Sequence, residues 1–396
     1  MAKAIGTAEE CDLRLTTKVA GLFLTMVAQA ALARAPAPEL PHPDEIPIAI
    51  LVDLSSGQVL HQRNADRRFM PASITKVMTT FLAFELIEQG KLKPDQRFRF
   101  SPAAFAVWGN NGSTMFLAAN DELAASDLLL GVTTVSGNDA AVALAEGAVG
   151  SLPAWTALMN AKAAELGMTQ SHFGTPNGLP DEGSTFVTAR DLAKLGSALV
   201  RRHPELYARY YGHRRLTYRG ITQPNHDPFT GQVRGGDGIK TGFTNEAGYG
   251  FLGSAKRGDR RLVLVVAGAE RGRIRDNAAR DYLEWGFQRF DTRPLFAAGE
   301  EVGKARVQGG ASRRVPLVAK DYIGAAMPEG QQRQLTLTVH YDGPLRAPIR
   351  EGQQVAELEI AVEGMEPSRV PLYAGTDVPV AGTFARLVNG VLGWFG

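Results

Sequence analysis

The chain has 396 residues, which is enough for two domains of ordinary size. Hydrophobic residues make up 44% and charged residues 21%, so a large packed core is available and the composition argues against a disordered chain. The formal net charge of +2 argues against a nucleic-acid-binding protein that works through a broad basic field.

The first 33 residues follow the order of an export signal. Basic residues come first, an apolar run at 19–28 follows, and small residues at 28–33 end the segment. The apolar run is short for a membrane-spanning helix. We therefore predict a signal peptide at 1–33, with an uncleaved anchor or a buried helix as the alternative.

Cysteine and histidine usage limits the chemistry that the chain can perform. The only cysteine, Cys11, lies in the predicted leader, so a mature exported chain would contain no thiol for a disulfide, a nucleophile or a metal ligand. The seven histidines show no metal-ligand spacing. The sequence therefore predicts neither a metal nor any other cofactor.

Beyond a proline-rich linker at 34–46, the predicted elements alternate between strand and helix. Strand-forming residues at 48–52 precede a turn and a return arm at 58–60, and apolar residues at helical spacing predict a helix at 73–89. Further helices are predicted at 124–130, 139–147, 152–166, 188–200 and 276–290, and the two strands of a hairpin at 248–255 and 261–267. Strands at both ends with helices between them indicate one α/β or α+β domain whose ends share a sheet.

The chain changes character after the last of these helices. From 296 to 380, short alternating runs are separated by turn clusters, which predicts a separate all-β domain. At 383–396, apolar residues recur on one face of a short helix, with Trp394 beside them. Such a helix is too short to span a bilayer but suits its interface, so we predict a membrane-associating helix. A terminal helix docked on the β-rich domain is the alternative.

Three short motifs carry the chemistry of the chain. Ser73-Ile74-Thr75-Lys76 stands at the start of a predicted helix, where a serine and a lysine three residues apart share one face. Ser136-Gly137-Asn138 lies between two predicted helices, and Lys240-Thr241-Gly242 precedes strand-forming residues. Each motif alone has an ordinary explanation as a helix cap, a loop or an edge strand. Together, in this order, they resemble the motif set of the penicillin-binding proteins and serine β-lactamases.

The resemblance is most specific to the low-molecular-mass D-alanyl-D-alanine carboxypeptidases of the penicillin-binding protein 5/6 type. The segments that carry it are Gly112-Ser113-Thr114-Met115-Phe116-Leu117, Asn177-Gly178-Leu179, Asn225, Asp237-Gly238-Ile239-Lys240-Thr241-Gly242, Ala247-Gly248-Tyr249 and Ser254-Ala255. The resemblance implies an α+β fold. Its parts would be a β-lactamase/transpeptidase-like catalytic domain at 47–292, with an antiparallel sheet and a helical cluster, a small all-β domain at 296–380 and an amphipathic helix at 383–396.

The residue types suggest the roles at the first two motifs. A serine hydroxyl is a weak nucleophile that needs a base, and no histidine motif is available, so Ser73 is the predicted nucleophile and Lys76 its base. Lys76 must be neutral to accept a proton, and partial burial and the second cation Lys240 would both lower its pKa. Ser136 is predicted to relay the proton to the leaving amine. Asn138 is predicted either to hydrogen-bond a substrate amide or to orient Lys76.

A carboxypeptidase must also bind the free carboxylate at the end of its substrate. Lys240 and Thr241 supply a cation and a hydroxyl on a strand edge, and Gly242 lets the substrate backbone approach closely. By resemblance, Arg275 falls where an arginine assists near the carboxylate site. A salt-bridged surface position is the alternative for Arg275.

The backbone N–H groups of Ser73 and Phe243 are the predicted oxyanion hole. Phe243 stands where several relatives carry histidine, and His226, after Asn225, stands where several carry arginine. A backbone role at position 243 is compatible with any side chain, so we expect activity to be retained.

The resemblance implies an exported enzyme that removes the terminal D-alanine from peptidoglycan pentapeptides. Such an enzyme is acylated by β-lactam antibiotics and works in the periplasm or at the outer face of the cytoplasmic membrane, without nucleic acid. A β-lactamase is one alternative, although no Glu-x-x-Leu-Asn segment precedes the third motif. A D,D-endopeptidase is another, although such relatives generally lack the second domain. A catalytically idle peptidoglycan-binding protein is the third, although all three motifs are intact.

Overall fold

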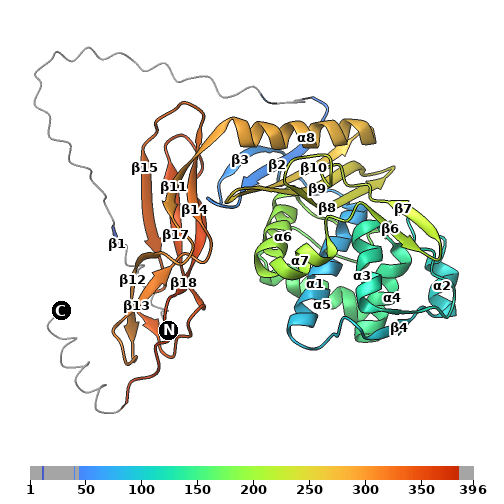
Figure 1. The fold of residues 1–396 in the computed structure, drawn as a ribbon, viewed down its shortest axis with the longest axis horizontal. Coiled ribbons are helices and arrows are strands. Elements are labelled where there is room, and N and C mark those ends of the chain that lie inside the picture. Colours follow the sequence, from blue (N-terminus) through green and yellow to red (C-terminus); the bar gives the residue numbers. More distant parts are fainter. Residues whose placement is uncertain (1–10, 13–39, 41–43, 383–396) are drawn as a thin grey trace, which may run out of the picture. The chain divides into compact units, whose positions relative to one another are not determined.

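The computed structural model describes residues 11–12, 40 and 44–382 of the chain. They divide into two compact units (Figure 1). One unit holds Leu40–Leu54 and Val59–Phe287, and the other holds Ser55–Gln58 and the described chain from residue 288 onwards, together with residues 11–12. Apart from Cys11 and Asp12, the predicted leader lies outside the described residues, as do the predicted C-terminal helix and most of the predicted linker.

The larger unit is built on a five-stranded sheet in the order β3-β2-β10-β9-β8. Its strands are β2 (Ile48–Asp53), β3 (Val59–Arg63), β8 (Gly236–Thr244), β9 (Gly248–Arg257) and β10 (Arg260–Ala269). Every neighbouring pair is antiparallel. The early strand β2 pairs with the late strand β10, so the two ends of this unit share one sheet. This confirms the α+β class and places β8 at an edge of the sheet.

Helices cover both faces of this sheet (Figure 1). Helix α8 (Gly272–Gln288) lies on one face, and α6 (Ala189–Arg202) packs against β10, β9 and β2 on the other. Helix α6 buries Leu192, Leu195 and Leu199 along one stripe, which is the pattern of a helix with one apolar face. The side chain of Thr188 accepts a hydrogen bond from the N–H of Asp191 and so caps the helix start.

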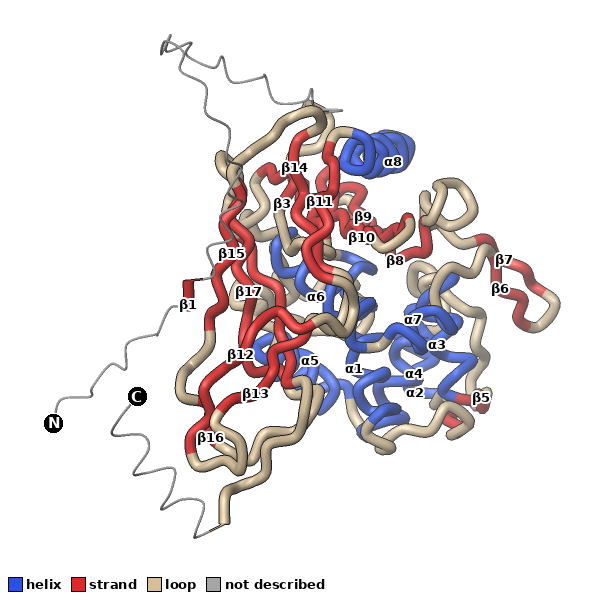
Figure 2. Tube along the Cα trace, turned by 60° about the vertical axis from the view of Figure 1, so that its left-hand side comes forward, coloured by secondary structure: helices blue, strands red, loops and turns tan. Residues whose placement is uncertain are grey.

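A helical cluster completes the larger unit. It consists of the 3-10 turn η1 (Ala72–Thr75), α1 (Lys76–Glu88), α2 (Pro102–Trp108), α3 (Ala125–Thr134), α4 (Asn138–Val149), α5 (Leu152–Glu165) and α7 (Pro204–Tyr210). Two small two-stranded antiparallel sheets flank it, β4 (Arg97–Arg99) with β5 (Glu122–Ala124) and β6 (Arg215–Tyr218) with β7 (Ile221–Pro224). Helix α1 contacts α3, α4, α5 and α6 and lies in the middle of the cluster (Figure 2). Its buried residues surround it on all sides, as expected of a central helix.

The smaller unit is all-β. Its strands are β1 (Cys11–Asp12), β11 (Phe290–Phe296), β12 (Glu301–Gln308), β13 (Arg314–Val318), β14 (Ile323–Pro328), β15 (Leu335–His340), β16 (Leu345–Arg346), β17 (Gln354–Val362) and β18 (Ser368–Ala374). Seven of them form one sheet in the order β1-β15-β17-β18-β13-β12-β16, and β11 pairs with β14. Strand β17 alternates buried and half-buried residues, so one of its faces lines the core of this unit.

The smaller unit includes the turn between β2 and β3. The side-chain amide of Gln58 donates to the carbonyl of Ala326 at 3.1 Å and accepts from the N–H of Ala326 at 2.7 Å. The hydroxyl of Ser368 donates to the carbonyl of Ser56 at 2.7 Å. From the sequence, this segment reads only as the turn of a hairpin; the long-range hydrogen bonds explain why residues Ser55–Gln58 group with the β-rich unit.

Several element bounds differ from the sequence prediction. The helix predicted at 276–290 begins one turn earlier, at Gly272, and Phe290 already belongs to strand β11. The helix predicted at 124–130 continues as α3 to Thr134. The short helices α2 and α7 were not predicted, and both begin with a proline in the first turn, which is a favourable start for a helix. Over the described ranges, no single helix is long and apolar enough to cross a membrane, and only the bent pair α4–α5 reaches that length and composition together.

Candidate active site

The first motif brings a serine and a lysine into direct contact. Lys76 Nζ lies 2.8 Å from Ser73 Oγ, because η1 runs directly into α1 and places the two side chains on one side of the turn. The residue before the serine, Ala72, has φ +49°, a left-handed conformation that is unfavourable for a residue with a Cβ. Strained backbone of this kind is typical of functional sites.

Lys76 is completely buried, and within the described chain it forms no ion pair. Burial lowers the pKa of Lys76 well below its usual value, the charge of Lys240 lowers it further, and the carboxylate of Asp139 opposes both effects. Burial and the charge of Lys240 therefore both favour the neutral form of this amine. The predicted requirement for a lysine base is therefore supported by the surroundings of this amine.

The backbone carbonyl of Asn177 is a second partner of Lys76 and was not predicted. Lys76 Nζ donates to this oxygen at 2.8 Å. A neutral amine has two N–H donors and one lone pair, so a bond to Asn177 leaves the lone pair available to the Ser73 hydroxyl. Asn177 thus orients Lys76, the role that the sequence offered to Asn138 as one of two options.

Close packing places the Asn177 carbonyl. Gly178 follows it with φ +75°, and a Cβ there would lie 1.9 Å from the carbonyl oxygen of Ala72. Only glycine combines this backbone conformation with this approach to the segment that carries Ser73. The Asn177-Gly178 segment therefore requires glycine for a reason that the sequence motif alone does not reveal.

The second motif forms the turn between α3 and α4. Ser136 is buried with φ +63°, a second left-handed residue of the candidate site, and Asn138 begins α4. The amide nitrogen of Asn138 donates to the carbonyl of Asn111 at 2.6 Å. Its side-chain oxygen is buried and has no hydrogen-bond partner among the described residues, so it can accept a hydrogen bond from a substrate N–H. This favours contact with a substrate amide over contact with Lys76.

Asp139 holds a loop next to the second motif. Its carboxylate accepts hydrogen bonds from the N–H groups of Met115, Leu117 and Ala140 at 2.8 to 3.1 Å. Burial raises the pKa of Asp139, and these backbone hydrogen bonds oppose the rise. The sequence analysis gave Asp139 no role, although an aspartate in the first turn of a predicted helix is a recognisable capping signal.

The third motif lies on the edge strand β8. Lys240 is buried, and its ammonium group donates to the carbonyl of Thr241 at 3.1 Å. Burial and the charge of Arg275 lower the pKa of Lys240 to about 7, although the carboxylate of Asp227 opposes them. An anion placed next to Lys240 would raise this pKa and hold the amine in its charged form. Asp227, another residue that the sequence analysis missed, accepts hydrogen bonds from the N–H groups of Phe229 and Thr230.

The next two residues of β8 lie beside the serine segment. A Cβ on Gly242 would lie 2.5 Å from the carbonyl oxygen of Pro71, so β8 and the start of η1 are in close contact at this point. Phe243 is 47% exposed, and its ring stacks on Tyr249 with ring centres 4.1 Å apart. Strand β8 and η1 are thus in contact beside Phe243, and the oxyanion hole formed by the N–H groups of Ser73 and Phe243 stays a prediction.

Arg275 lies on α8 and is 7% exposed. It forms an ion pair with Asp276 at 2.6 Å and lies close enough to Lys240 and His226 to lower the pKa of each. Arg275 is therefore salt-bridged but buried, and it belongs to the same cationic region as Lys240. His226 lies in this region as well, with a pKa lowered first by burial and then by these two cations.

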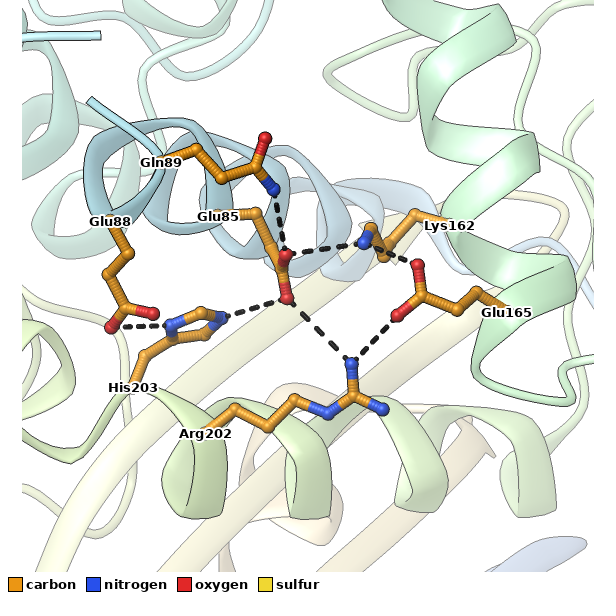
Figure 3. A network of polar contacts seen from close by, with 7 residues as sticks. All are labelled: Glu85, Glu88, Gln89, Lys162, Glu165, Arg202 and His203. Atoms are coloured by element: carbon orange, nitrogen blue, oxygen red, sulfur yellow. Dashed lines mark hydrogen bonds and ion pairs between the residues drawn. The ribbon is translucent and has the colours of Figure 1, made fainter. Parts of the chain in front are cut away.

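The opposite end of α1 carries a network of charges (Figure 3). His203 is buried, with Nδ1 2.9 Å from a carboxylate oxygen of Glu88 and Nε2 3.4 Å from one of Glu85. Lys162 lies 3.3 Å from Glu85 and 2.6 Å from Glu165. These contacts connect α1 to α5 and to the α6–α7 junction, and so hold the helix that carries the first motif.

No cluster of three or more metal-ligating side chains occurs in the part of the chain that the structure describes. The candidate site consists of lysine, arginine, serine, threonine and asparagine side chains together with backbone groups.

Comparison with known proteins agrees with the resemblance that the sequence motifs indicated. The sequence profile described as D-alanyl-D-alanine carboxypeptidase matches residues 41–271, and that of the penicillin-binding protein 5 C-terminal domain matches residues 290–380. The D-alanyl-D-alanine carboxypeptidase DacC of Escherichia coli is 36% identical over 384 residues, which cover 94% of this chain and 95% of that protein.

Solved structures of penicillin-binding proteins have a similar fold. Penicillin-binding protein 5 from Haemophilus influenzae matches with a TM-score of 0.70 and 32% identity over 87% of this chain and 100% of that one. Penicillin-binding protein D2 from Listeria monocytogenes in its ampicillin-bound form matches with a TM-score of 0.57 and 29% identity over 64% of this chain and 100% of that one.

The fold, the paired serine and lysine and these likenesses define a serine hydrolase of the penicillin-binding protein class. More narrowly, the chain belongs to the D-alanyl-D-alanine carboxypeptidase family, the S11 serine peptidases, as the sequence motifs predicted.

Proposed function

We propose that this chain removes the terminal D-alanine from peptidoglycan pentapeptides through an acyl-enzyme on Ser73. The observation that carries the proposal is the contact of 2.8 Å between Ser73 Oγ and the fully buried amine of Lys76, whose pKa is lowered by burial. A buried amine without a carboxylate partner is costly to keep charged, and its neutral form is the one that accepts a proton from a serine.

In the acylation step, Lys76 takes the proton of the Ser73 hydroxyl as Oγ attacks the carbonyl between the two terminal D-alanines. The oxyanion accepts hydrogen bonds from the N–H groups of Ser73 and Phe243, each of which is worth about 3 kcal/mol in comparable sites. The C–N bond then breaks, and Ser136 gives its proton to the leaving amine of D-alanine while it takes up the proton held by Lys76, which returns Lys76 to its neutral form. Water hydrolyses the ester, with Lys76 again as the base.

The substrate carboxylate binds at the cationic region of Lys240 and Arg275, beside the hydroxyl of Thr241. Gly242 allows the substrate backbone to lie along the edge strand β8, and the unpartnered side-chain oxygen of Asn138 accepts from a substrate N–H. A β-lactam presents the same carboxylate and a strained amide, so it acylates Ser73 by the same step. The ampicillin-bound relative supports this expectation.

The test is release of D-alanine from a pentapeptide that ends in D-alanyl-D-alanine, measured beside a cross-linked dimer of stem peptides. We expect release from the pentapeptide and little cleavage of the dimer; the reverse would indicate a D,D-endopeptidase. Penicillin labelling followed by peptide mapping should place the label on Ser73, and label on another serine would contradict the mechanism. A rapid loss of bound penicillin would favour a β-lactamase.

We also propose that residues 1–33 direct export. Residues 383–396 then hold the enzyme at the outer face of the cytoplasmic membrane, and the domains at 47–292 and 296–380 lie between these two segments in the sequence. The charge order of the leader and the apolar face of the last residues support this. Deletion of 383–396 should move the protein from the membrane fraction to the soluble fraction. An unchanged distribution would favour a helix docked on the β-rich unit.

A further inference from the structure

Helix α1 carries a third polar side chain in line with Ser73 and Lys76. Thr79 follows Lys76 by three residues, as Lys76 follows Ser73, and this spacing places neighbouring side chains on one face of a helix. Thr79 is completely buried. Burial of a hydroxyl costs free energy unless a hydrogen bond compensates for it, so the partners of this side chain indicate its role.

The Thr79 hydroxyl holds the chain segment that supplies the backbone partner of Lys76. It donates to the carbonyl of Pro176 at 2.7 Å, and Lys76 Nζ donates to the next carbonyl along the chain, that of Asn177, at 2.8 Å. Two successive carbonyls thus accept hydrogen bonds from side chains one turn apart on α1. The segment Pro176-Asn177 is therefore connected to the helix that carries the base at two adjacent points.

Hydrogen bonds inside this segment give it the shape of a turn. The N–H of Gly178 donates to the Thr175 hydroxyl at 3.0 Å, and the N–H of Leu179 donates to the side-chain oxygen of Asn177 at 3.1 Å. These bonds join residues of the turn to one another, whereas the bonds from Thr79 and Lys76 connect the turn to α1.

Helix α5, which packs beside α1 (Figure 2), sets the direction of the Thr79 hydroxyl. The indole N–H of the fully buried Trp155 donates to this hydroxyl at 3.4 Å. A hydroxyl that accepts from an indole has its own hydrogen available for another acceptor. The Pro176 carbonyl is that acceptor, because the sulfur of Met159 lies 3.9 Å away and accepts only weakly.

We infer that Thr79 is a positioning residue for the base: its hydroxyl places the Pro176-Asn177 segment so that the Asn177 carbonyl accepts one N–H of Lys76 and the lone pair of the amine faces Ser73. The inference rests on the proposed function, because the role of Lys76 as the base comes from it. When Lys76 takes the proton of Ser73, the same carbonyl accepts from an ammonium group, and such a hydrogen bond is stronger than one from a neutral amine. The carbonyl that Thr79 places therefore favours the proton transfer as well as the orientation of the amine.

Removal of the hydroxyl tests this role. Thr79→Val keeps the shape of the side chain but leaves the Pro176 carbonyl without this donor. We expect the highest rate of acylation by penicillin, measured across the pH range, to fall about tenfold, because the amine is no longer held in its reactive orientation. The kcat for D-alanine release should fall with it at a nearly unchanged KM. Thr79→Ser keeps the hydroxyl and should restore most of the rate.

The pH profile of acylation separates positioning from a general loss of packing. Acylation requires a neutral Lys76, so its rate falls on the acid side of the profile as the amine becomes protonated. A carbonyl acceptor favours the charged amine, so displacement of the Asn177 carbonyl should lower the pKa of Lys76 and move this acid limb to lower pH. The charges of Lys240 and Asp139, which also act on this pKa, are the same in the parent and the variant.

The matched control is Thr133→Val. Thr133 is also a buried helix threonine, and its hydroxyl donates at 2.7 Å to a backbone carbonyl, that of Tyr210. This variant loses a comparable hydrogen bond in the same unit, so thermal unfolding should show a similar loss of stability. It should nevertheless acylate at nearly the parent rate and keep the acid limb of the parent. If Thr79→Val does not fold, Thr79→Ala removes the same hydroxyl and should show the same shift of the limb.

The outcomes separate this inference from the function on which it rests. A parent rate and a parent limb in the Thr79 variants, a lower rate with an unmoved limb, or the same change in Thr133→Val would each overturn the positioning role. The carboxypeptidase would then stand, provided that the parent releases D-alanine. If the parent is acylated by penicillin but releases no D-alanine from the pentapeptide, the proposed function fails, and the acylation profiles still decide the role of Thr79.

Discussion

The two ends of helix α1 differ in whether their charged side chains form ion pairs. At its start, the amine of Lys76 is fully buried, and its partners are a hydroxyl and a backbone carbonyl. At its end, Glu85 lies within ion-pair distance of Lys162 and His203, and the side chains remain partly open to solvent apart from the histidine. The same helix therefore carries one amine whose charge is disfavoured and a group of charges that balance one another.

The amine that we expect to react and the ion pairs that stabilise α1 therefore lie at different ends of the helix. Carboxylates beside an amine favour its charged form, whereas burial without an ion-pair partner lowers its pKa and favours the neutral form that can act as a base. The neighbouring cation Lys240 acts in the same direction. The contacts of the paired end connect α1 to its neighbours, and we expect the amine at the unpaired end to take up a proton during the reaction.

The largest effect should follow from removing the unpaired amine. Lys76→Met keeps the length and burial of the side chain but supplies no base, so acylation by penicillin should slow at least 1,000-fold, about 4 kcal/mol in the barrier. Stopped-flow acylation of the purified protein measures it. The matched control is Lys162→Met at the paired end, which should acylate at nearly the parent rate. Equal slowing in both variants would contradict the contrast between the two ends.

The next effect concerns the carbonyl that orients Lys76. Gly178→Ala forces a Cβ against the Ala72 carbonyl and should displace Asn177, which we expect to slow acylation about 10- to 100-fold. The matched control is Gly183→Ala, at φ +84° with open space around it, which carries the conformational cost of about 1 kcal/mol alone. Acylation rates and thermal unfolding of both variants are compared. If Gly183→Ala slows acylation equally, packing at Asn177 is irrelevant.

The sequence analysis named the side chains of the candidate site but not the backbone contact that orients Lys76. Ser73, Lys76 and Lys240 belong to motifs whose residue types indicate a nucleophile, a base and a cation for the substrate carboxylate. Asn177 acts through a backbone carbonyl, which every residue possesses, so its side chain gives no signal of this role.

Long-range packing was equally hidden from the sequence. Helices α1, α5 and α6 were predicted to within a few residues of their ends. The turn Ser55–Gln58 was not recognised as part of the β-rich unit, because hydrogen bonds to Ala326 and Ser368 join residues that are far apart in the chain. Asp139 could have been found from its place in the first turn of a helix.

A smaller effect is expected on the pH dependence of KM, through the charge of Lys240. With a pKa of about 7, Lys240 loses its charge as the pH rises through neutrality, while the substrate carboxylate stays ionised. The KM for the pentapeptide should therefore rise about tenfold between pH 6 and pH 9. Lys240→Arg stays charged throughout, so its KM should remain nearly flat, whatever its absolute value. Parallel profiles for the two proteins would show that Lys240 does not bind the carboxylate through its charge.

The smallest effect is expected at the paired end. Glu85→Gln removes a carboxylate that lies near Lys162, Arg202 and His203, and should lower the free energy of unfolding of the catalytic unit by about 1 kcal/mol. Glu88→Gln removes a more exposed carboxylate whose partner in the described chain is His203, and it should cost less. Both variants should acylate at close to the parent rate once folded, because the network lies at the far end of α1 from Ser73. A variant that unfolds normally but acylates much more slowly would show that the paired end tunes the reaction as well as the fold. The separation of the two ends would then not hold.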